Sequence, residues 1–461
     1  MDCDLPTDFD IIVVGTGVVE SIVSAAASRI GKRVLHIDSN NYYGGLWASF
    51  NLDAIQQLNV ISERTEESFS SELVKENEKV FPVGNNLFNL KNVQIKWHIP
   101  EKVEPKEETE ENEVNKPAKV TQWTEESLIK DSRKFNIDLT PKLQFARGEF
   151  VELLISSNIA RYSEYRSVSR VLTWLNGQLE MVPCSRSDVF ANNKVTVIEK
   201  RMLMKLFLSL DSGDQEYVGY ENKTFRAFLK DKKLTPNLIH YVLYAISMST
   251  DETLCLQGIQ STKRFLDSLG RFGKTPFLFS MLSAVFGGIY ALNQPLKGLI
   301  FDSDNRFQGL LCGKQRINAD YLIMGVEKTP QVFIKSSPQS YISRGILITN
   351  KSIMSSEKEH LTLMLYPPED DIVHLISKQI TNPFEDLKHC VENLFNKSED
   401  GRPDILWSCY FSIPDSNDLD LKTTAPKNVA ICPGPDLDLD YDNSVKKIQN
   451  FFQERLIQKK S

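Results

Sequence analysis

The sequence predicts an α/β protein in which a Rossmann-type domain carries an inserted, small all-helical domain. Three observations predict this architecture. The chain opens with a strand–turn–helix–strand pattern that holds part of a dinucleotide-binding glycine motif. Its middle turns helical, and strand-like segments punctuated by glycine follow. At 461 residues the chain is also too long for one simple core, so we expect two domains, the first at 1–183 and 273–461 and the helical one at 184–272.

The first elements expected are a strand over residues 9–14 and a helix over residues 17–30. The strand is almost continuously apolar, as in a parallel strand that is covered on both faces. Gly15 and Gly17 stand where a dinucleotide motif has its first two glycines, which form the tight turn and let the backbone approach a pyrophosphate. Glu20 stands where the third glycine belongs, and its charge opposes that of a pyrophosphate. The motif therefore predicts a flavoprotein-like domain, of the FAD- or NAD(P)-binding Rossmann type, with defective cofactor binding.

A second strand is expected over residues 33–38, and it completes a βαβ unit of the usual length. Asp38 ends this strand, where an acidic residue would hold a ribose hydroxyl in a dinucleotide site. The other interpretation is a carboxylate that caps the turn after the strand. Because Glu20 already weakens the case for a cofactor, we favour the turn-capping carboxylate.

The helical domain is predicted from two strongly apolar segments. Residues 195–210 are apolar on almost every face, and residues 235–248 begin with a capping residue, Thr235, and a proline at the first helical position. These helices either pack against one another or line a groove that accepts lipid. Further along, the pattern predicts strands that return to the first domain and a closing amphipathic helix, at residues 286–292, 298–301, 319–324 and 442–453.

Composition and charge argue against several classes of protein. A net charge of −7 argues against general nucleic-acid binding, and no run approaches the roughly 18 apolar residues of a membrane span, so any membrane contact is expected to be peripheral. Neither the seven cysteines nor the six histidines show metal-ligand spacing, so we expect no metal site and a reduced, cytosolic chain. No catalytic constellation stands out. Residues 101–117 are rich in Glu and predict a disordered acidic surface loop, with an acidic recognition segment as the other interpretation.

Segments along nearly the whole chain resemble the superfamily of Rab escort proteins and Rab GDP-dissociation inhibitors. The resemblance is carried by residues 38–45, 182–190, 197–205, 269–279, 284–290 and 431–435. The stretch Tyr43-Gly-Gly-Leu-Trp-Ala-Ser-Phe50 is similar to the escort branch, and inhibitors lack a phenylalanine corresponding to Phe190. The resemblance implies a flavoprotein-like domain with a small helical domain, no FAD or nicotinamide cofactor, and no catalysis. A Glu in place of the third glycine is usual in this superfamily.

The resemblance also implies binding roles for particular residues. Tyr42 and Tyr43 would belong to the platform that grips GDP-bound Rab, and Phe190 and Arg201 would contact the α subunit of Rab geranylgeranyltransferase. A groove for the geranylgeranyl lipid of Rab would be lined by Met202, Leu206, Leu238, Val242 and Ile246. The residues alone, without the resemblance, also allow another interpretation. One of the tyrosines would pack under the sheet, Phe190 would be a core residue of the first helix, and Arg201 would be a solvated charge on a helix surface.

One departure from the superfamily pattern follows Phe279. Members carry a stretch there that supplies a Glu and an Arg to the Rab platform, whereas this chain continues directly with Ser280 and has Met281 where the Arg is expected. Loss of one partner of a charged interface pair typically costs ~2–5 kcal/mol, so affinity for Rab would fall strongly. A divergent member, a splice form and an error in the predicted gene are all compatible with this departure.

The sequence leaves four functions open. The favoured one is a non-enzymatic escort that binds newly made Rab–GDP, presents it to Rab geranylgeranyltransferase and delivers the prenylated product to membranes through transient contact. The others are a Rab GDP-dissociation inhibitor, an escort-like protein that grips Rab poorly and, on the fold alone, a flavin-dependent oxidoreductase. Glu20 argues against the oxidoreductase.

Overall fold

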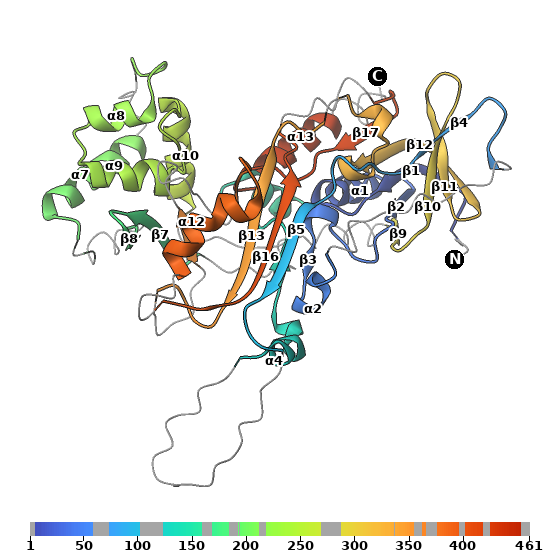
Figure 1. The fold of residues 1–461 in the computed structure, drawn as a ribbon. Coiled ribbons are helices and arrows are strands. Elements are labelled where there is room, and N and C mark those ends of the chain that lie inside the picture. The colour runs from blue at the N-terminus through green and yellow to red at the C-terminus, as the bar shows by residue number, and fades with distance from the viewer. Residues whose placement is uncertain are drawn as a thin grey trace, which may run out of the picture. The chain divides into compact units, whose positions relative to one another are not determined.

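The structure is a computed structural model of the 461-residue chain (Figure 1). It describes residues 5–58, 73–101, 123–158, 168–183, 192, 194–211, 218–268, 287–335, 337–354, 362–365, 376–395, 402–417 and 425–452. The chain divides into two compact units. The first comprises Met1–Pro141, Ser283–Ser355 and Lys378–Leu437, and the second comprises Lys142–Leu282, Ser356–Ser377 and Asp438–Ser461.

Within the described residues, the first unit is built on an eight-stranded sheet in the order β4-β10-β11-β12-β1-β2-β9, with β17 beside β12. The strands are β1 Asp8–Val14, β2 Val34–Ile37, β4 Lys79–Pro82, β9 Ile289–Ala291, β10 Leu296–Phe301, β11 Phe307–Cys312, β12 Gln315–Gly325 and β17 Val429–Cys432. β1 runs parallel to both of its neighbours, β2 and β12, as a Rossmann-type domain requires. β1, β2, β10 and β12 confirm the strands predicted over residues 9–14, 33–38, 298–301 and 319–324. β9 lies within the strand predicted over residues 286–292, the first residue of which lies outside the described residues.

The connection from β1 to α1 forms because the sequence supplies a buried strand, a tight turn and a helix in succession. Residues 11–14 of β1 are at most 1% exposed. Helix α1, Val18–Arg29, begins after Gly17 and is followed by Gly31, whose φ of +81° favours glycine. Small buried residues such as Ser24 and Ala25 allow α1 to pack closely on β1, β2 and β12. The helix predicted over residues 17–30 is confirmed.

A second, four-stranded sheet in the order β15-β13-β16-β5 has most of its residues in the first unit. Its strands are β5 Lys91–Trp97, β13 Tyr341–Thr349, β15 Ile376–Lys378 and β16 Ile405–Pro414, and helix α12 Pro383–Phe395 packs on β13 and β16. The smaller elements of this unit are β3 Ser49–Phe50, β6 Ile137–Asp138, α2 Leu52–Ile55 and α4 Glu125–Lys130. Short 3₁₀ turns occur at Gly45–Trp47, Ser132–Lys134, Val326–Lys328 and Gln331–Phe333.

The second unit is mainly helical. Its elements are α5 Glu149–Ser156, β7 Arg170–Leu175, β8 Gln178–Met181, α7 Val197–Asp211, α8 Phe225–Asp231, α9 Pro236–His240, α10 Cys255–Asp267, β14 Thr362–Leu365 and α13 Asp442–Phe452. Helices α7 to α10 lie together in Figure 1, and their buried apolar side chains form one core. The apolar helix predicted over residues 195–210 is confirmed. Thr235 caps α9 as predicted, because its side chain accepts a hydrogen bond from the Leu238 N–H.

The α-helix predicted over residues 235–248 is wrong in its second half. Helix α9 ends at His240, and the chain continues as a π-helix, Tyr241–Ile246. At its end the Ser247 N–H donates to the carbonyl of Val242, five residues earlier. All six residues of the π-helix are buried. A uniformly apolar run does not distinguish an α turn from a wider π turn, so the periodicity of the sequence gave no sign of it.

The second unit takes in more of the chain than the helical domain expected at 184–272, because α5, α13 and the three-stranded sheet β14-β7-β8 belong to it. Both ends of the expected domain lie outside the described residues. Arg264 of α10 helps to hold α13 in this unit, since its Nη1 lies 2.9 Å from an oxygen of Asp440 and 3.7 Å from one of Asp442. None of the helices in the described ranges is both long and apolar enough to span a membrane.

Candidate functional site

The candidate site lies at the carboxyl ends of the parallel strands β1, β2 and β12, where Rossmann-type folds bind their ligands. The turn after β1 holds Gly15, whose φ of +101° favours glycine, and Gly17 immediately precedes α1. Glu20 lies in the first turn of α1, and Asp38 directly follows β2. The structure thus brings the four residues of the predicted glycine motif to one edge of the sheet.

A buried ion pair joins two of these strand ends. Lys328 follows β12, and its Nζ lies 2.6 Å from Oδ1 of Asp38 and 3.1 Å from the hydroxyl of Ser39. Both charged side chains are 0% exposed. The Thr16 hydroxyl donates to Oδ2 of Asp38 at 2.8 Å, and the Asn40 N–H donates to Oδ1 at 3.0 Å. Asp38 therefore has the contacts of a turn-capping carboxylate, with a counter-ion that the local sequence pattern did not reveal.

The charge of Asp38 is stabilised in spite of its burial. Burial alone raises the pKa of Asp38, but the positive charge and the hydrogen bond of Lys328 lower it, as do the hydrogen bonds from the Asn40 N–H and the Thr16 hydroxyl. The net pKa lies below the ordinary value of an aspartate. Asp38 is therefore ionised at neutral pH, and the oxygens that would hold a ribose hydroxyl are engaged by the protein itself.

Two carboxyl groups meet beside this ion pair. Glu20 is 2% exposed, and Glu327 is 7% exposed. A Cβ atom on Gly325 would contact an oxygen of Glu20 and, at 2.7 Å, an oxygen of Glu327, so both carboxyl groups use the space that this glycine leaves. Burial raises the pKa of Glu20 well above its usual value, and the negative charges of Glu327 and then of Asp38 raise it further. The Glu20 carboxyl therefore favours its neutral form. We call Glu20, Asp38, Glu327 and Lys328 the buried charge cluster.

The buried charge cluster does not fit a dinucleotide. A Cβ atom on Gly17 would contact the carboxyl group of Glu20. In dinucleotide-binding proteins the corresponding glycine lets the backbone approach the pyrophosphate, whereas here the side chain of Glu20 lies against it. The negative charge of Glu327 would also repel the pyrophosphate. Asp38 is paired with Lys328 instead of being open to a ribose. The residues of the glycine motif are thus in contact with the protein's own charged side chains.

Residues 39–44, which we call the tyrosine segment, follow Asp38 directly and hold both tyrosines of the predicted Rab platform. Tyr42 and Tyr43 are half-buried. The Tyr42 ring lies edge-on to Phe50 with the ring centroids 4.9 Å apart, and the Tyr43 ring lies 6.0 Å from the ring of Tyr290. Each tyrosine ring therefore contacts another aromatic ring of the protein while part of it remains exposed to solvent, as a protein-binding surface requires.

Hydrogen bonds tie the tyrosine segment to the buried charge cluster. The Gly44 N–H donates to the Thr16 hydroxyl at 3.0 Å, and that hydroxyl donates to Asp38. Gly44 has a φ of +103°, and a Cβ there would lie 2.8 Å from the backbone of Ala48, so only glycine fits this turn. The position of the tyrosines thus depends on the same carboxylate that pairs with Lys328.

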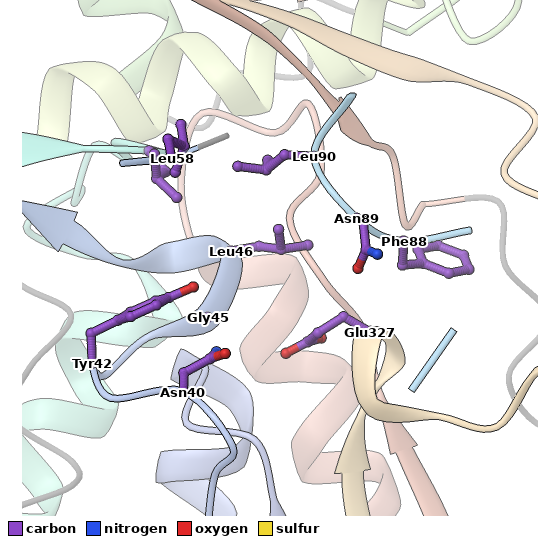
Figure 2. Close-up of a pocket in the computed structure, with 10 residues that line it drawn as sticks. Asn40, Tyr42, Gly45, Leu46, Leu58, Phe88, Asn89, Leu90 and Glu327 are labelled. Atoms are coloured by element: carbon purple, nitrogen blue, oxygen red, sulfur yellow. The ribbon is translucent and has the colours of Figure 1, made fainter. Parts of the chain in front are cut away.

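A small pocket, with a volume of about 40 Å³, is lined by residues of both the tyrosine segment and the buried charge cluster. Its lining residues are Asn40, Tyr42, Gly45, Leu46, Leu58, Phe88, Asn89, Leu90, Leu139 and Glu327. Figure 2 shows the carboxylate of Glu327 pointing into the pocket, with Asn40 and Tyr42 on the side of the tyrosine segment. Sequence reasoning missed Glu327, because nothing in its local pattern places it beside Glu20.

Arg201, the transferase contact that the resemblance implies, is exposed on α7. It belongs to a row of exposed side chains that we call the α7 stripe. The stripe consists of Val197, Ile198, Arg201, Lys205 and Leu208. Its three apolar members are 55% to 71% exposed, and spacings of three and four residues put the row on one face of the helix. Sequence analysis did not single out this combination. Phe190 lies outside the described residues.

The residues predicted to line a lipid groove come together in the core of the second unit. Leu206, Leu238, Val242 and Ile246 are at most 4% exposed, and the half-buried Met202 packs against the same core. In the described structure these side chains therefore form a packed core, which was the other interpretation of the apolar helices, and not an open groove.

The acidic segment predicted at residues 101–117 lies outside the described residues apart from Glu101. The same holds for Phe279, Ser280 and Met281, where the sequence departs from the superfamily pattern. Within the described ranges, no group of three or more His, Cys, Asp or Glu side chains is arranged to hold a metal ion.

The fold defines a Rossmann-type protein in which the carboxyl group of Glu20 lies against Gly17 and Asp38 is paired with Lys328. The chain matches the family model described as GDP dissociation inhibitor over residues 5–78 and 113–373, and the model described as RAE1/2 domain I, C-terminal region, over residues 371–437. It belongs to the GDP dissociation inhibitor family. It is 31% identical, over an alignment of 593 positions, to Rab proteins geranylgeranyltransferase component A 1 from Rattus norvegicus. The alignment covers 98% of this chain and 91% of that protein, and it confirms the resemblance to Rab escort proteins.

Solved structures confirm the fold class. Rab GDI from Plasmodium falciparum is similar with a TM-score of 0.63 and 16% identity, covering 98% of this chain and 100% of that chain. An oxidoreductase from Methanosarcina mazei is similar with a TM-score of 0.50 and 10% identity, covering 96% of this chain and 100% of that chain. At these identities the likeness concerns the fold alone, and the fold is the flavoprotein-like one expected from the sequence.

The buried ion pair of Lys328 and Asp38 predicts that replacing the lysine strongly destabilises the folded protein. Lys328→Met should lower the free energy of unfolding by about 3–5 kcal/mol, because Asp38 would remain buried without a counter-ion. Urea unfolding followed by circular dichroism measures the change. The double variant D38N/K328M should recover much of the loss, since neither partner is then charged. Equal stability of Lys328→Met and the unaltered protein would contradict this account.

The raised pKa of Glu20 predicts that Glu20→Gln increases the stability of the protein by an amount that depends on pH. The folded protein holds a proton on Glu20 more tightly than the unfolded chain does, so the stability that this group contributes is complete at low pH and is lost as the pH rises through the folded pKa. Glutamine does not ionise. The variant should therefore gain stability relative to the unaltered protein between pH 5 and pH 8, measured by urea unfolding at both values, and a constant difference would refute the assignment.

Proposed function

We propose that this protein is a Rab escort protein. It binds GDP-bound, unprenylated Rab GTPases, presents them to Rab geranylgeranyltransferase and delivers the prenylated Rab to membranes. The observation that carries the proposal is the similarity to component A of Rab geranylgeranyltransferase over 98% of the chain. The buried charge cluster supports a role in binding a protein, because it fills the position that a redox cofactor would need.

The protein is proposed to act without a cofactor and without catalysis of its own. Glu20 and Glu327 bring carboxyl groups to the place of the pyrophosphate, and Asp38 is occupied by Lys328. A flavin oxidoreductase would need the place of the pyrophosphate to be free of the carboxyl groups of Glu20 and Glu327, and Asp38 to be open to the ribose. The absorption spectrum of the purified protein distinguishes the two functions, since a bound flavin absorbs visible light and an escort protein should show only the absorption of its aromatic side chains.

Two surfaces are proposed to serve two partners. The half-buried Tyr42 and Tyr43 bind GDP-bound Rab, and the α7 stripe around Arg201, with Phe190, binds the α subunit of the transferase. Arginine is enriched among the hot spots of protein interfaces, and the exposed apolar side chains beside Arg201 offer surface that a partner can bury. The core around Leu238 and Val242 is proposed to shelter the geranylgeranyl lipid after it opens. The protein is proposed to reside in the cytosol and to contact membranes only transiently.

Two alternatives remain as proposals of lower rank. A Rab GDP-dissociation inhibitor would bind Rab but not the transferase, and the similarity to component A does not favour it. An escort-like protein with weakened Rab binding is motivated by Met281, which stands where the superfamily supplies an arginine to the Rab platform. Restoring the missing stretch after Phe279 should raise Rab affinity if this alternative is correct.

Reconstituted prenyl transfer tests the proposed function. GDP-loaded Rab, Rab geranylgeranyltransferase and radiolabelled geranylgeranyl diphosphate are mixed with and without this protein, and lipid incorporated into Rab is counted. We expect transfer only when the protein is present. Transfer no greater than in the control without the protein would refute the escort function, and binding of Rab without transfer would favour the inhibitor.

The α7 stripe predicts a variant that separates the two partners. Arg201→Glu should weaken binding of the transferase about 10-fold or more, because it reverses a charge at an exposed, partly apolar interface, and should leave binding of GDP-loaded Rab unchanged. Surface plasmon resonance with each partner measures both. Lys230→Ala, an exposed cation on α8, is the matched control and should affect neither. If Arg201→Glu and Lys230→Ala bind the transferase equally well, the α7 stripe is not part of the interface.

A further inference from the structure

We infer that Arg344, a buried arginine of β13, is a positioning residue for the surface that binds Rab. The inference rests on the proposed role of Tyr42 in binding Rab, and it adds to that role a residue that acts through the backbone between the two. The connection runs from Arg344 to residues 137–140, which we call the β6 segment, and from there through Phe50 to Tyr42. All of these residues belong to the first unit.

The guanidinium of Arg344 holds two successive carbonyl groups of the β6 segment. Its Nε donates to the carbonyl oxygen of Leu139 at 3.1 Å, and its Nη2 lies 3.5 Å from that of Asp138. Nη1 donates to the carbonyl oxygen of Gly345, within β13, at 2.9 Å. Burial lowers the pKa of Arg344 to about 10, so the group stays charged at neutral pH. Charged donors make stronger hydrogen bonds than neutral ones, and the planar fork joins β13 to the β6 segment.

The β6 segment needs such a support because its own strand pairing is short. β3 and β6 pair through two residues each, Ser49 with Asp138 and Phe50 with Ile137. Even a full two-stranded hairpin is only marginally stable by itself. A buried guanidinium is also costly, and an apolar side chain at position 344 would avoid that cost but could not donate to the two carbonyl groups. The position that Arg344 gives to the β6 segment therefore explains why a charge is buried here.

The β6 segment in turn holds the stretch of chain that follows the tyrosine segment. The Leu139 N–H donates to the carbonyl oxygen of Ala48 at 3.0 Å, and the Thr140 hydroxyl donates to that of Leu46 at 2.8 Å. With the two residue pairs of β3 and β6, these bonds run along residues 46–50. A displacement of the β6 segment therefore displaces this stretch as well.

Phe50 transmits the position of this stretch to Tyr42. Phe50 is 6% exposed, and the half-buried ring of Tyr42 lies edge-on to it with the ring centroids 4.9 Å apart. Such a contact depends on the placement of both rings. If Phe50 moves, Tyr42 loses the ring against which it is held. Rab would then have to order this tyrosine on binding, and the free energy of that ordering opposes association.

Arg344→Met tests the inference, because methionine is also long and unbranched but donates no hydrogen bond. Fluorescently labelled, GDP-loaded Rab is titrated with each variant. We expect Arg344→Met to bind Rab about 10-fold more weakly, as when the ordering of interface side chains is added to the cost of binding. Binding of the transferase, for which the α7 stripe is proposed, should not change.

Ser343→Ala is the matched control. Ser343 precedes Arg344 in β13, so its side chain points to the opposite face of the strand, where its hydroxyl donates to Asp386 at 2.6 Å. The variant loses a buried hydrogen bond and should unfold at a lower temperature. It should nevertheless bind Rab as the unaltered protein does. If lower stability alone weakened Rab binding, Ser343→Ala would weaken it too.

Two further measurements keep the test decisive if Arg344→Met does not fold. Arg344→Lys keeps the charge but not the planar fork that reaches both carbonyl groups, so it should bind Rab more weakly than Ser343→Ala does. Hydrogen exchange followed by mass spectrometry reports on the tyrosines without Rab. Peptides that cover residues 42–50 should exchange faster in the Arg344 variants and at the unaltered rate in Ser343→Ala.

A double-mutant cycle separates positioning of Tyr42 from a general loss of structure. In the Tyr42→Ala background, Arg344→Met should change Rab affinity by about 2-fold or less, because the side chain that it positions is gone. If the unaltered protein binds Rab, but the Arg344 variants bind equally well or their effect adds fully to that of Tyr42→Ala, this inference alone is overturned. If the unaltered protein binds no Rab, the proposed function fails, and unchanged exchange of residues 42–50 in the Arg344 variants would then refute the positioning role as well.

Discussion

The architecture of the candidate site depends on the buried pair of Lys328 and Asp38. The two residues lie 290 positions apart in the sequence, and each follows a strand of the central sheet. A buried charge without a partner costs several kcal/mol, so the ends of β2 and β12 are held where the ammonium and the carboxylate meet. β1 lies between these two strands, and Thr16 from its turn donates to the same carboxylate. Through Thr16 and Gly44 the pair also fixes the tyrosine segment.

The carboxyl groups of Glu20 and Glu327, together with this pair, change what this edge of the sheet can bind. In a dinucleotide-binding protein, glycines and a helix N-terminus leave room and partial positive charge for a pyrophosphate. Here Glu20 and Glu327 fill the room, and the positive charge of Lys328 is balanced by Asp38. The space that remains is a small pocket with a carboxylate at its wall. The edge at which Rossmann-type enzymes bind an anionic cofactor is therefore crowded by acidic side chains in this chain.

The sequence predicted the elements that local patterns determine and missed the contacts that the tertiary fold determines. An apolar run, two glycines and a capping residue placed β1, α1 and Thr235 correctly, because strand burial, tight turns and helix caps depend on neighbouring residues. Lys328 could not be assigned to Asp38, since no local pattern relates the loops after β2 and β12. The π-helix at Tyr241–Ile246 was missed because a uniformly apolar run has no periodicity that distinguishes an α turn from a π turn. Burial of Leu238 was predicted, but whether it faced a groove or a core depended on the packing of neighbouring helices.

That packing sets a condition on how a lipid is bound under the proposed function. Leu238, Val242 and Ile246 are at most 1% exposed, so a geranylgeranyl chain reaches them only by displacing side chains of the core. Burial of the lipid contributes roughly 0.8 kcal/mol per CH₂ group, and it replaces one set of apolar contacts with another. The π-helix, whose closing hydrogen bond spans five residues, interrupts the regular α-helical geometry in this core. The lipid itself must therefore supply the free energy that opens the core, and without lipid these apolar side chains stay out of water.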